Sequence, residues 1–177
     1  PPGTLYRAEL DEDSGFGSIN QTSVTAQTQA QFSGLSINAT YYARVAAINA
    51  LGELSANVLL GSTVTLANIP LPLDSTFSAV AISSLTFQWA QNNNPYGSVY
   101  WAHISSYANF SPLAASSLTL WSQAGFDALT PNTSYYARVL ARNHTGRDTA
   151  WTTLGSTMTR PAPALAADER GEGQGDR

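Results

Sequence analysis

Apolar and polar residues alternate in short stretches along this chain, and clusters of Gly, Pro and Asn separate the stretches. Successive side chains of a strand point to opposite faces, and turn residues every 8 to 12 residues or so typically bound such strands. In the second half of the chain, the pattern predicts strands at residues 77–81, 84–90, 98–104, 117–124, 134–143 and 151–159. No long stretch has helical periodicity, because prolines interrupt the windows that come closest. The sequence therefore predicts an all-β protein.

The chain contains an internal repeat at an offset of 94 residues. Residues 1–65 align with residues 95–159 without a gap and share about 25 identities. The longest identical segments are Tyr-Tyr-Ala-Arg-Val at 41–45 and 135–139, and Leu-Gly-Ser-Thr at 60–63 and 154–157. This period is longer than the roughly 20 to 50 residues of solenoid and propeller repeats. Each copy is therefore expected to be a domain.

Three segments of the second copy carry a family resemblance. Residues 85–89 read Leu-Thr-Phe-Gln-Trp, residues 129–135 read Leu-Thr-Pro-Asn-Thr-Ser-Tyr, and residues 135–143 alternate apolar and polar positions. Together they resemble the fibronectin type III family, in which strand B carries a buried Trp and a tyrosine corner ties the E–F connection to strand F. The resemblance implies immunoglobulin-like β-sandwiches in tandem, with Trp89 and Tyr135 in these two roles.

The repeat and the resemblance divide the chain into four parts: a partial repeat at 1–65, a linker at 66–72, a complete repeat at 73–160, and a tail at 161–177. The tail is rich in Pro, Ala, Gly and charge, so we expect it to be disordered. Residues 73–94 supply strands A and B of the second repeat, and nothing before Pro1 supplies their equivalents. We therefore expect the natural protein to continue upstream. As it stands, the first repeat would expose an apolar inner face that favours self-association.

Composition and charge narrow the range of functions. Only 11% of the residues are charged and the net charge is −4, so no excess positive charge is available to bind nucleic acid. Cys is absent, which excludes disulfides, thiolate metal sites and Cys nucleophiles. The longest apolar runs are far shorter than the roughly 20 residues that span a bilayer, so we expect no membrane span.

Candidate catalytic and metal-binding groups are few. His103 and His144 are the only histidines, and neither recurs in the other copy or lies in a metal-ligand motif. We expect both to be exposed and structural. The acidic run at 11–13 lacks the alternating oxygen ligands and distal Glu of a calcium loop, so we expect a solvated C–C′ turn. We predict no catalytic residue, metal site or cofactor, and no enzyme activity.

One set of residues on the predicted C–F–G sheet of the second repeat is a candidate ligand platform. Period-two spacing turns these side chains outward: Trp101, His103, Tyr136, Arg138 and Arg142. Aromatic rings beside Arg would suit a glycan or a protein. The alternative is a cross-strand ladder in which Arg138 stacks on Trp101 and no ligand binds, and Arg7 in place of Trp101 in the first copy favours it. Trp121, expected to face outward on the other sheet, has the same two interpretations.

These features favour a non-enzymatic structural or adhesive repeat module of a larger extracellular or cell-surface protein. The repeat is similar in style to tandem arrays of bacterial surface or secreted proteins. Two prolines in the linker should hold successive domains in a semi-extended line, and the variable outer faces would select a protein or glycan partner. The alternative is a carbohydrate- or protein-binding accessory module of a secreted enzyme, with Trp101, Trp121 and Tyr136 as stacking groups.

Overall fold

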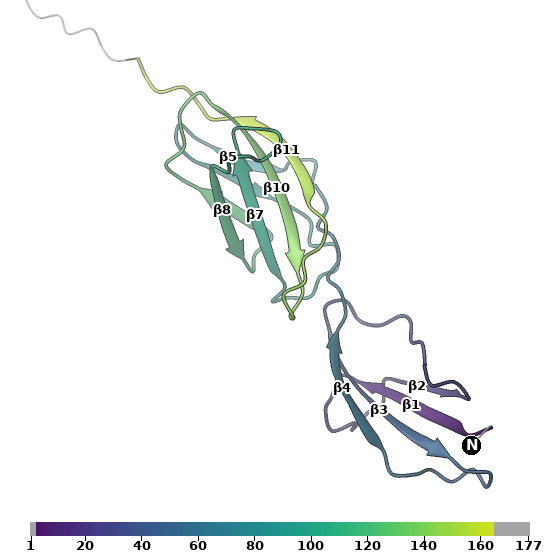
Figure 1. The fold of residues 1–177 in the computed structure, drawn as a ribbon. Helices are drawn as coiled ribbons and strands as arrows, with labels where there is room; N and C mark the ends of the chain where they lie inside the picture. The colour runs from purple at the N-terminus through teal and green to yellow at the C-terminus, as the bar shows by residue number, and fades with distance from the viewer. Residues whose placement is uncertain (1–2, 165–177) are drawn as a thin grey trace, which may run out of the picture.

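Two β-rich bodies lie end to end in the computed structural model of the chain, which describes residues 3–164 (Figure 1). The N-terminal body contains strands β1 to β4, and the C-terminal body contains strands β5 to β11. The described residues form no helix. Below, the two repeats have the boundaries predicted from the sequence: the N-terminal repeat is residues 1–65, described from residue 3 onward, and the C-terminal repeat is residues 73–160.

The C-terminal repeat is a sandwich of two antiparallel sheets. One sheet has the order β5-β6-β9, with the bounds Phe77–Val80, Leu85–Gln88 and Gln123–Phe126. The other has the order β11-β10-β7-β8, with the bounds Thr152–Met158, Ser134–Arg142, Val99–Ser105 and Ala115–Thr119. In the strand letters of the fibronectin type III family, these sheets are A-B-E and G-F-C-C′. The predicted all-β, immunoglobulin-like fold is confirmed.

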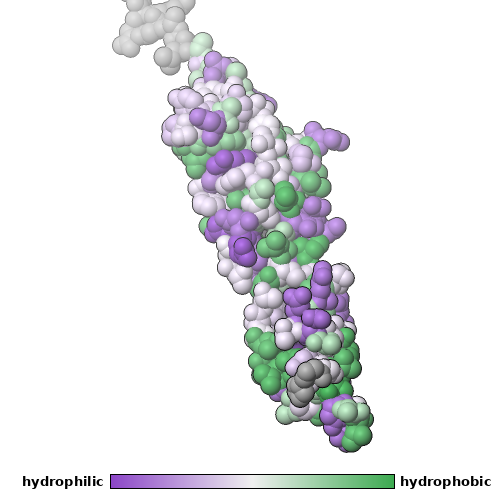
Figure 2. Space-filling model, turned by 45° about the vertical axis from the view of Figure 1, so that its right-hand side comes forward, coloured by the Kyte–Doolittle hydropathy of each residue, from purple (hydrophilic) through white to green (hydrophobic). Residues whose placement is uncertain are grey.

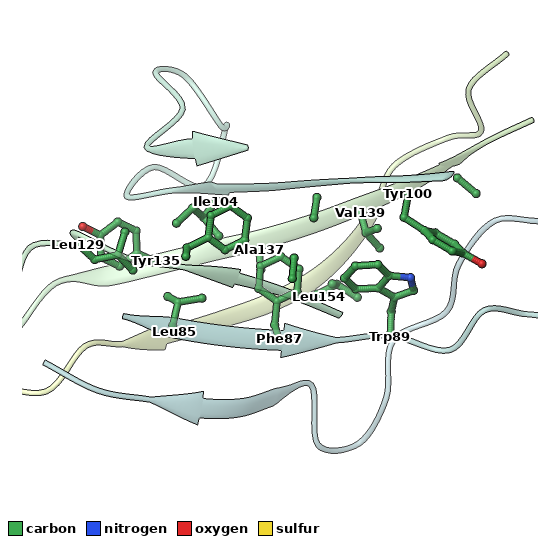
Figure 3. Packing of buried hydrophobic residues seen from close by; sticks show 14 of the residues in the cluster. Leu85, Phe87, Trp89, Tyr100, Ile104, Leu129, Tyr135, Ala137, Val139 and Leu154 are labelled. Atoms are coloured by element: carbon green, nitrogen blue, oxygen red, sulfur yellow. The ribbon is translucent and has the colours of Figure 1, made fainter. Parts of the chain in front are cut away.

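The core of the C-terminal repeat lies between its two sheets (Figure 3). Strand β6 and the residue after it direct Leu85, Phe87 and Trp89 toward the opposite sheet, and each is at most 2% exposed. The ring centroid of Phe87 lies 5.6 Å from Phe126, and that of Trp89 lies 5.5 Å from Tyr100. Burying a side chain of this size contributes about 1.5–3 kcal/mol. The A–B hairpin therefore supplies a large part of the core.

A tyrosine corner closes the E–F connection in both repeats. In the C-terminal repeat, the hydroxyl of Tyr135 accepts a hydrogen bond from the backbone N–H of Thr130 at 3.0 Å. In the N-terminal repeat, the hydroxyl of Tyr41 accepts one from the N–H of Ser36 at 2.9 Å and donates to the Glu12 carboxylate at 2.8 Å. The corner predicted at Tyr135 is confirmed, and the first repeat forms the same bond although its turn has no proline.

The N-terminal repeat is a single four-stranded antiparallel sheet. Its order is β2-β1-β3-β4, with the bounds Gln21–Thr25, Leu5–Asp11, Thr40–Ile48 and Val58–Val64. Both repeats have a bulge in the F–G pairing, opposite Gly61 and Gly155, whose φ angles of 96° and 93° favour glycine. Residues 3–65 contain no strand that corresponds to β5, β6 or β9. One face of this sheet is therefore uncovered.

The stretch predicted as a single strand at 117–124 is two strands. β8 ends at Thr119 and pairs with β7, whereas β9 begins at Gln123 and pairs with β6 in the other sheet. Periodicity did not predict this break, because the chain changes sheets over only three residues. Most of the tail predicted to be disordered, from residue 165 onward, lies outside the described residues.

Candidate functional site: the outer face and the repeat junction

The candidate ligand platform lies on the solvent side of the sheet β11-β10-β7-β8, which we call the outer face. The β7–β10 register places His103 opposite Arg138 and Trp101 opposite Leu140. Residues two apart on a strand share a face. The outer face therefore brings together all five predicted residues: Trp101, His103, Tyr136, Arg138 and Arg142.

His103 is buried rather than exposed, which corrects the prediction. It is 4% exposed, and its ring centroid lies 4.8 Å from that of Trp101 and 4.4 Å from that of Trp151. Its Nδ1 accepts a hydrogen bond from Nη2 of Arg138 at 3.1 Å, so the ring is neutral and carries its proton on Nε2. Burial, assisted by the charge of Arg138, lowers the pKa of His103 to about 4. At neutral pH, His103 is thus a structural acceptor for Arg138.

The guanidinium group of Arg138 lies between two aromatic rings. Its Cζ is 4.3 Å from the ring centroid of Phe110 and 4.1 Å from that of Trp151. The stack on Trp101 is formed by Arg142, at 5.2 Å, and not by Arg138 as the ladder interpretation supposed. Contacts of this kind contribute about 0.5–2 kcal/mol each. Arg138 is therefore engaged in packing within the outer face.

Phe110 and Trp151 belong to this cluster although the sequence did not predict them. The pairing of Phe110 with Arg138 recurs in the N-terminal repeat, where Cζ of Arg44 lies 4.3 Å from the ring of Phe16. The joint recurrence of Phe and Arg at the repeat offset was the signal that could have found this pair. Trp151 has no such signal, because it is not repeated and only the fold brings it to the cluster.

The N-terminal repeat has ionised groups where the C-terminal repeat has rings. Glu9 aligns with His103 and is 5% exposed. Its carboxylate accepts a hydrogen bond from Nε of Arg44 at 2.7 Å, and Nε of Arg7 lies 3.0 Å from its other oxygen. A buried carboxylate is tolerated when it is paired in this way. The two outer faces therefore share a scaffold and differ in chemistry.

The most exposed apolar side chains near the outer face lie at its margin. Leu118 on β8 is opposite Trp101 and is 59% exposed. Trp121 is 64% exposed and lies in the connection between β8 and β9, so it is not on a strand of the other sheet as we expected. Tyr136 is half-buried. A binding role for the platform stays a prediction.

The acidic run forms the turn between β1 and β2, at the predicted C–C′ position. Glu12 and Asp13 are exposed as expected, whereas Asp11 is only 2% exposed, which corrects the prediction of a fully solvated turn. The carboxylate of Asp11 accepts hydrogen bonds from the backbone N–H groups of Asp13 and Ser18, and that of Asp13 accepts from Gly15 and Gly17. The two carboxylates thus close the turn. Within residues 3–164, no cluster of three or more His, Cys, Asp or Glu could hold a metal ion, and no helix is long and apolar enough to cross a membrane.

A second group of side chains, which no motif predicted, joins the two repeats. Asn38 is 1% exposed and has a left-handed backbone with a φ of 49°. Its Nδ2 donates to Oγ of Ser98 at 2.9 Å, and its Oδ1 accepts from the backbone N–H of His144 at 2.9 Å. Nδ2 of Asn143 donates to the carbonyl of Thr65 at 3.2 Å. These five residues, which we call the junction, make three hydrogen bonds between the repeats.

The linker at 66–72 is bound along the C-terminal repeat. The N–H of Asn68 donates to Oδ1 of Asn94 at 2.7 Å, and Nδ2 of Asn94 donates to the carbonyl of Asn68 at 2.8 Å. Leu71 and Ala90 exchange backbone hydrogen bonds at 3.1 and 2.9 Å, and Pro70 is fully buried. Hydrogen bonds therefore fix the linker beyond the stiffness that its prolines supply.

Among known proteins, no family model and no curated protein matches the chain. A crystal structure of the FN1–FN3 domains of chicken CNTN1 is similar at a TM-score of 0.41 and 15% identity, and the match covers 89% of this chain and 56% of that chain. A computationally redesigned β-sandwich protein is similar at a TM-score of 0.42 and 14% identity, covering 56% of this chain and 97% of that chain. This chain thus spans little more than half of the CNTN1 fragment. The fold rests on the strand order and the two tyrosine corners, and similarities this weak carry no functional argument.

Proposed function

We propose that this chain is a non-enzymatic structural segment of an extracellular or cell-surface protein, and that it holds two fibronectin type III-like repeats at a fixed spacing. The junction carries the proposal, because the buried side chain of Asn38 bonds to both Ser98 and the N–H of His144. The resemblance to fibronectin type III supports the extracellular location, since many cell-surface domains share that sandwich.

Relative motion is the usual state of two domains that share a small interface. Each net hydrogen bond contributes about 0.5–1.5 kcal/mol, so three bonds at the junction favour one orientation by about 1.5–4.5 kcal/mol. Every 1.4 kcal/mol or so is a tenfold change in population. The linker adds its own bonds to the C-terminal repeat, so the repeats should move as one stiff unit.

The distance between two spin labels tests this stiffness. The chain has no native Cys, so labels can be placed only at Thr22→Cys and Ser116→Cys, two exposed and equivalent positions in the two repeats. We expect pulsed electron resonance to give one narrow distance distribution. Asn38→Gly should broaden it, because glycine keeps the left-handed backbone and removes both side-chain bonds.

The matched control is Asn132→Gly, in the C-terminal repeat. Asn132 is the repeat equivalent of Asn38, has a similar φ of 51°, and is exposed. Its backbone N–H donates to the carbonyl of Arg160 in the same repeat, and Asn132 takes no part in the three bonds of the junction. This substitution should therefore leave the distribution narrow. A broad distribution in the labelled chain before either substitution would refute the spacer function.

The carbohydrate- or protein-binding alternative has less support from the side-chain arrangement. Of the five platform residues, His103 is buried and Arg138 lies between two rings. Neither can bind a ligand without giving up those contacts. Trp101, Tyr136 and Arg142 are only partly exposed, and the most exposed apolar side chains are those of Trp121 and Leu118 at the margin.

A further inference from the structure

The F–G loops, which connect β3 to β4 and β10 to β11, are built on the same frame in the two repeats. In the C-terminal loop, Oδ1 of Asn143 accepts a hydrogen bond from the N–H of Arg147 at 2.8 Å, and the N–H of Asn143 donates to the carbonyl of Arg147 at 2.9 Å. Asn49 and Glu53 occupy these positions in the N-terminal loop, and both bonds recur there at 2.9 Å. The side-chain amide of the loop Asn therefore starts from the same place in both repeats.

The two loops differ in what accepts a hydrogen bond from that amide. Nδ2 of Asn49 donates to the carboxylate of Glu53 in its own loop at 2.8 Å. Nδ2 of Asn143 instead donates across the junction, to the carbonyl of Thr65 at 3.2 Å. A hydrogen bond to an ionised acceptor is roughly twice as strong as one between neutral groups. A carboxylate in the loop therefore competes with the neighbouring repeat for the amide.

The groups that bond to the Asn38 side chain are of a kind that both repeats have. The hydroxyl of Ser98 accepts from its amide, and the equivalent Thr4 also carries a hydroxyl. The backbone N–H of His144 donates to its carbonyl oxygen, and the equivalent Ala50 has this N–H as well. The exchange of a carboxylate for a guanidinium in the F–G loop is therefore the difference that bears on the junction.

Arg147 lies beside the junction without being tied to it. It lines a cleft together with Leu66 of the linker. Its side chain is exposed and, among residues 3–164, makes no hydrogen bond or ion pair. The two bodies meet at a narrow waist (Figure 2), so few contacts decide how they are held. A guanidinium has donors and no acceptor, so Arg147 leaves the amide of Asn143 to Thr65.

We propose that the residue at position 147 selects which repeat can be held at the junction. Arg147 makes the C-terminal repeat a partner for the N-terminal repeat, because it leaves Nδ2 of Asn143 to bond across the junction. An acid at this position, as at Glu53, keeps the amide within its own loop and weakens the hold on the neighbour. This selection rests on the proposed function and adds the chemistry by which one repeat accepts another.

Hydrogen exchange at the backbone amide of His144 tests the proposal. This amide donates to Asn38 across the junction, so it exchanges when the repeats separate. In Arg147→Glu, we expect this exchange to be faster by about two- to tenfold, which is the effect of losing one net hydrogen bond. The amide of Gly146 donates to the carbonyl of Asn143 inside the loop and should exchange at an unchanged rate. The pair of amides thus separates undocking of the repeats from opening of the loop.

Two matched variants isolate the carboxylate. Arg147→Met introduces no acceptor oxygen and should leave exchange at His144 unchanged, whereas Arg147→Gln has the shape of Glu without its charge and should give a smaller change than Arg147→Glu. Equal exchange at His144 in Arg147→Glu and Arg147→Met would overturn this proposal and leave the proposed function in place, as would equal changes in Arg147→Gln and Arg147→Glu. A broad spin-label distribution in the unsubstituted chain would instead remove the proposed function, and this proposal with it.

Discussion

At a single position, the two repeats bury a polar side chain by opposite means. The buried carboxylate of Glu9 is paired with the guanidinium groups of Arg7 and Arg44. The aligned His103 is neutral and accepts a hydrogen bond from Arg138. Asp148 lies on the turn between β10 and β11 and is bound by Arg142. The hydrogen bonds from Arg142 hold the pKa of Asp148 below its usual value. A protonated His103 would therefore face Arg138 without a counter-charge.

This arrangement predicts acid sensitivity of the C-terminal repeat. Because the folded pKa of His103 is about 4 and the unfolded pKa is about 6.5, the unfolded chain binds more protons between these values. The contribution of neutral His103 to the free energy of unfolding is fully present above pH 6.5, and that free energy should fall by up to about 1.4 kcal/mol per pH unit as the pH drops toward 4. Urea unfolding followed by Trp fluorescence at several pH values measures this free energy. His103→Asn should flatten this slope, and the exposed His144→Asn should not; equal slopes in both variants would contradict the argument.

Trp89 and Tyr135 could be predicted at the residue scale because their roles follow from local spacing. The burial of His103 could not, since it depends on Trp151, which the fold brings from the position just before β11. The role of Asn38 was missed for a related reason. In the sequence, Asn38 is an ordinary turn residue, since Asn tolerates the left-handed backbone that it adopts here. Its partners Ser98 and His144 lie in the other repeat, so local spacing gives no sign of them.

At the scale of elements, alternation predicted most strands but not whether a strand has a partner. Residues 29–32 read Gln-Ala-Gln-Phe and residues 123–126 read Gln-Ala-Gly-Phe. Only the second segment is a strand, because β6 lies beside it. Strand formation reflects pairing and burial more than intrinsic preference. The same context explains why 117–124 contains two strands of different sheets.

The linker should stabilise the C-terminal repeat as an element of that repeat. Asn94→Ala removes both bonds to the backbone of Asn68, and each polar group left without a partner costs about 1–3 kcal/mol where water cannot replace the bond. We expect a lower unfolding midpoint by Trp fluorescence and faster hydrogen exchange at Asn68. Gln91→Ala, which alters an exposed amide nearby, should change neither. Unchanged exchange at Asn68 in Asn94→Ala would show that the linker is not held by this pair.

At the scale of the molecule, the two repeats differ in whether the inner face of the sheet is covered and in whether they contain Trp, which serves as a fluorescent probe. The C-terminal repeat buries the A–B hairpin, and the N-terminal repeat leaves the corresponding face open. All four Trp residues lie in the C-terminal repeat, at positions 89, 101, 121 and 151. Trp fluorescence therefore reports the C-terminal repeat alone, whereas far-ultraviolet circular dichroism reports strands of both.

These differences predict two separate unfolding steps. Each large apolar side chain left exposed, such as Leu60, forgoes about 1.5–3 kcal/mol of burial, so the N-terminal repeat should unfold at lower urea. Circular dichroism should show two transitions and Trp fluorescence only the second. Phe32→Ala should shift the first transition alone. Phe87→Ala should lower the free energy of unfolding of the C-terminal repeat by about 3–5 kcal/mol, and hence the midpoint of the second transition. A single transition, coincident by both probes, would mean that the junction couples the repeats strongly enough to make them one cooperative unit.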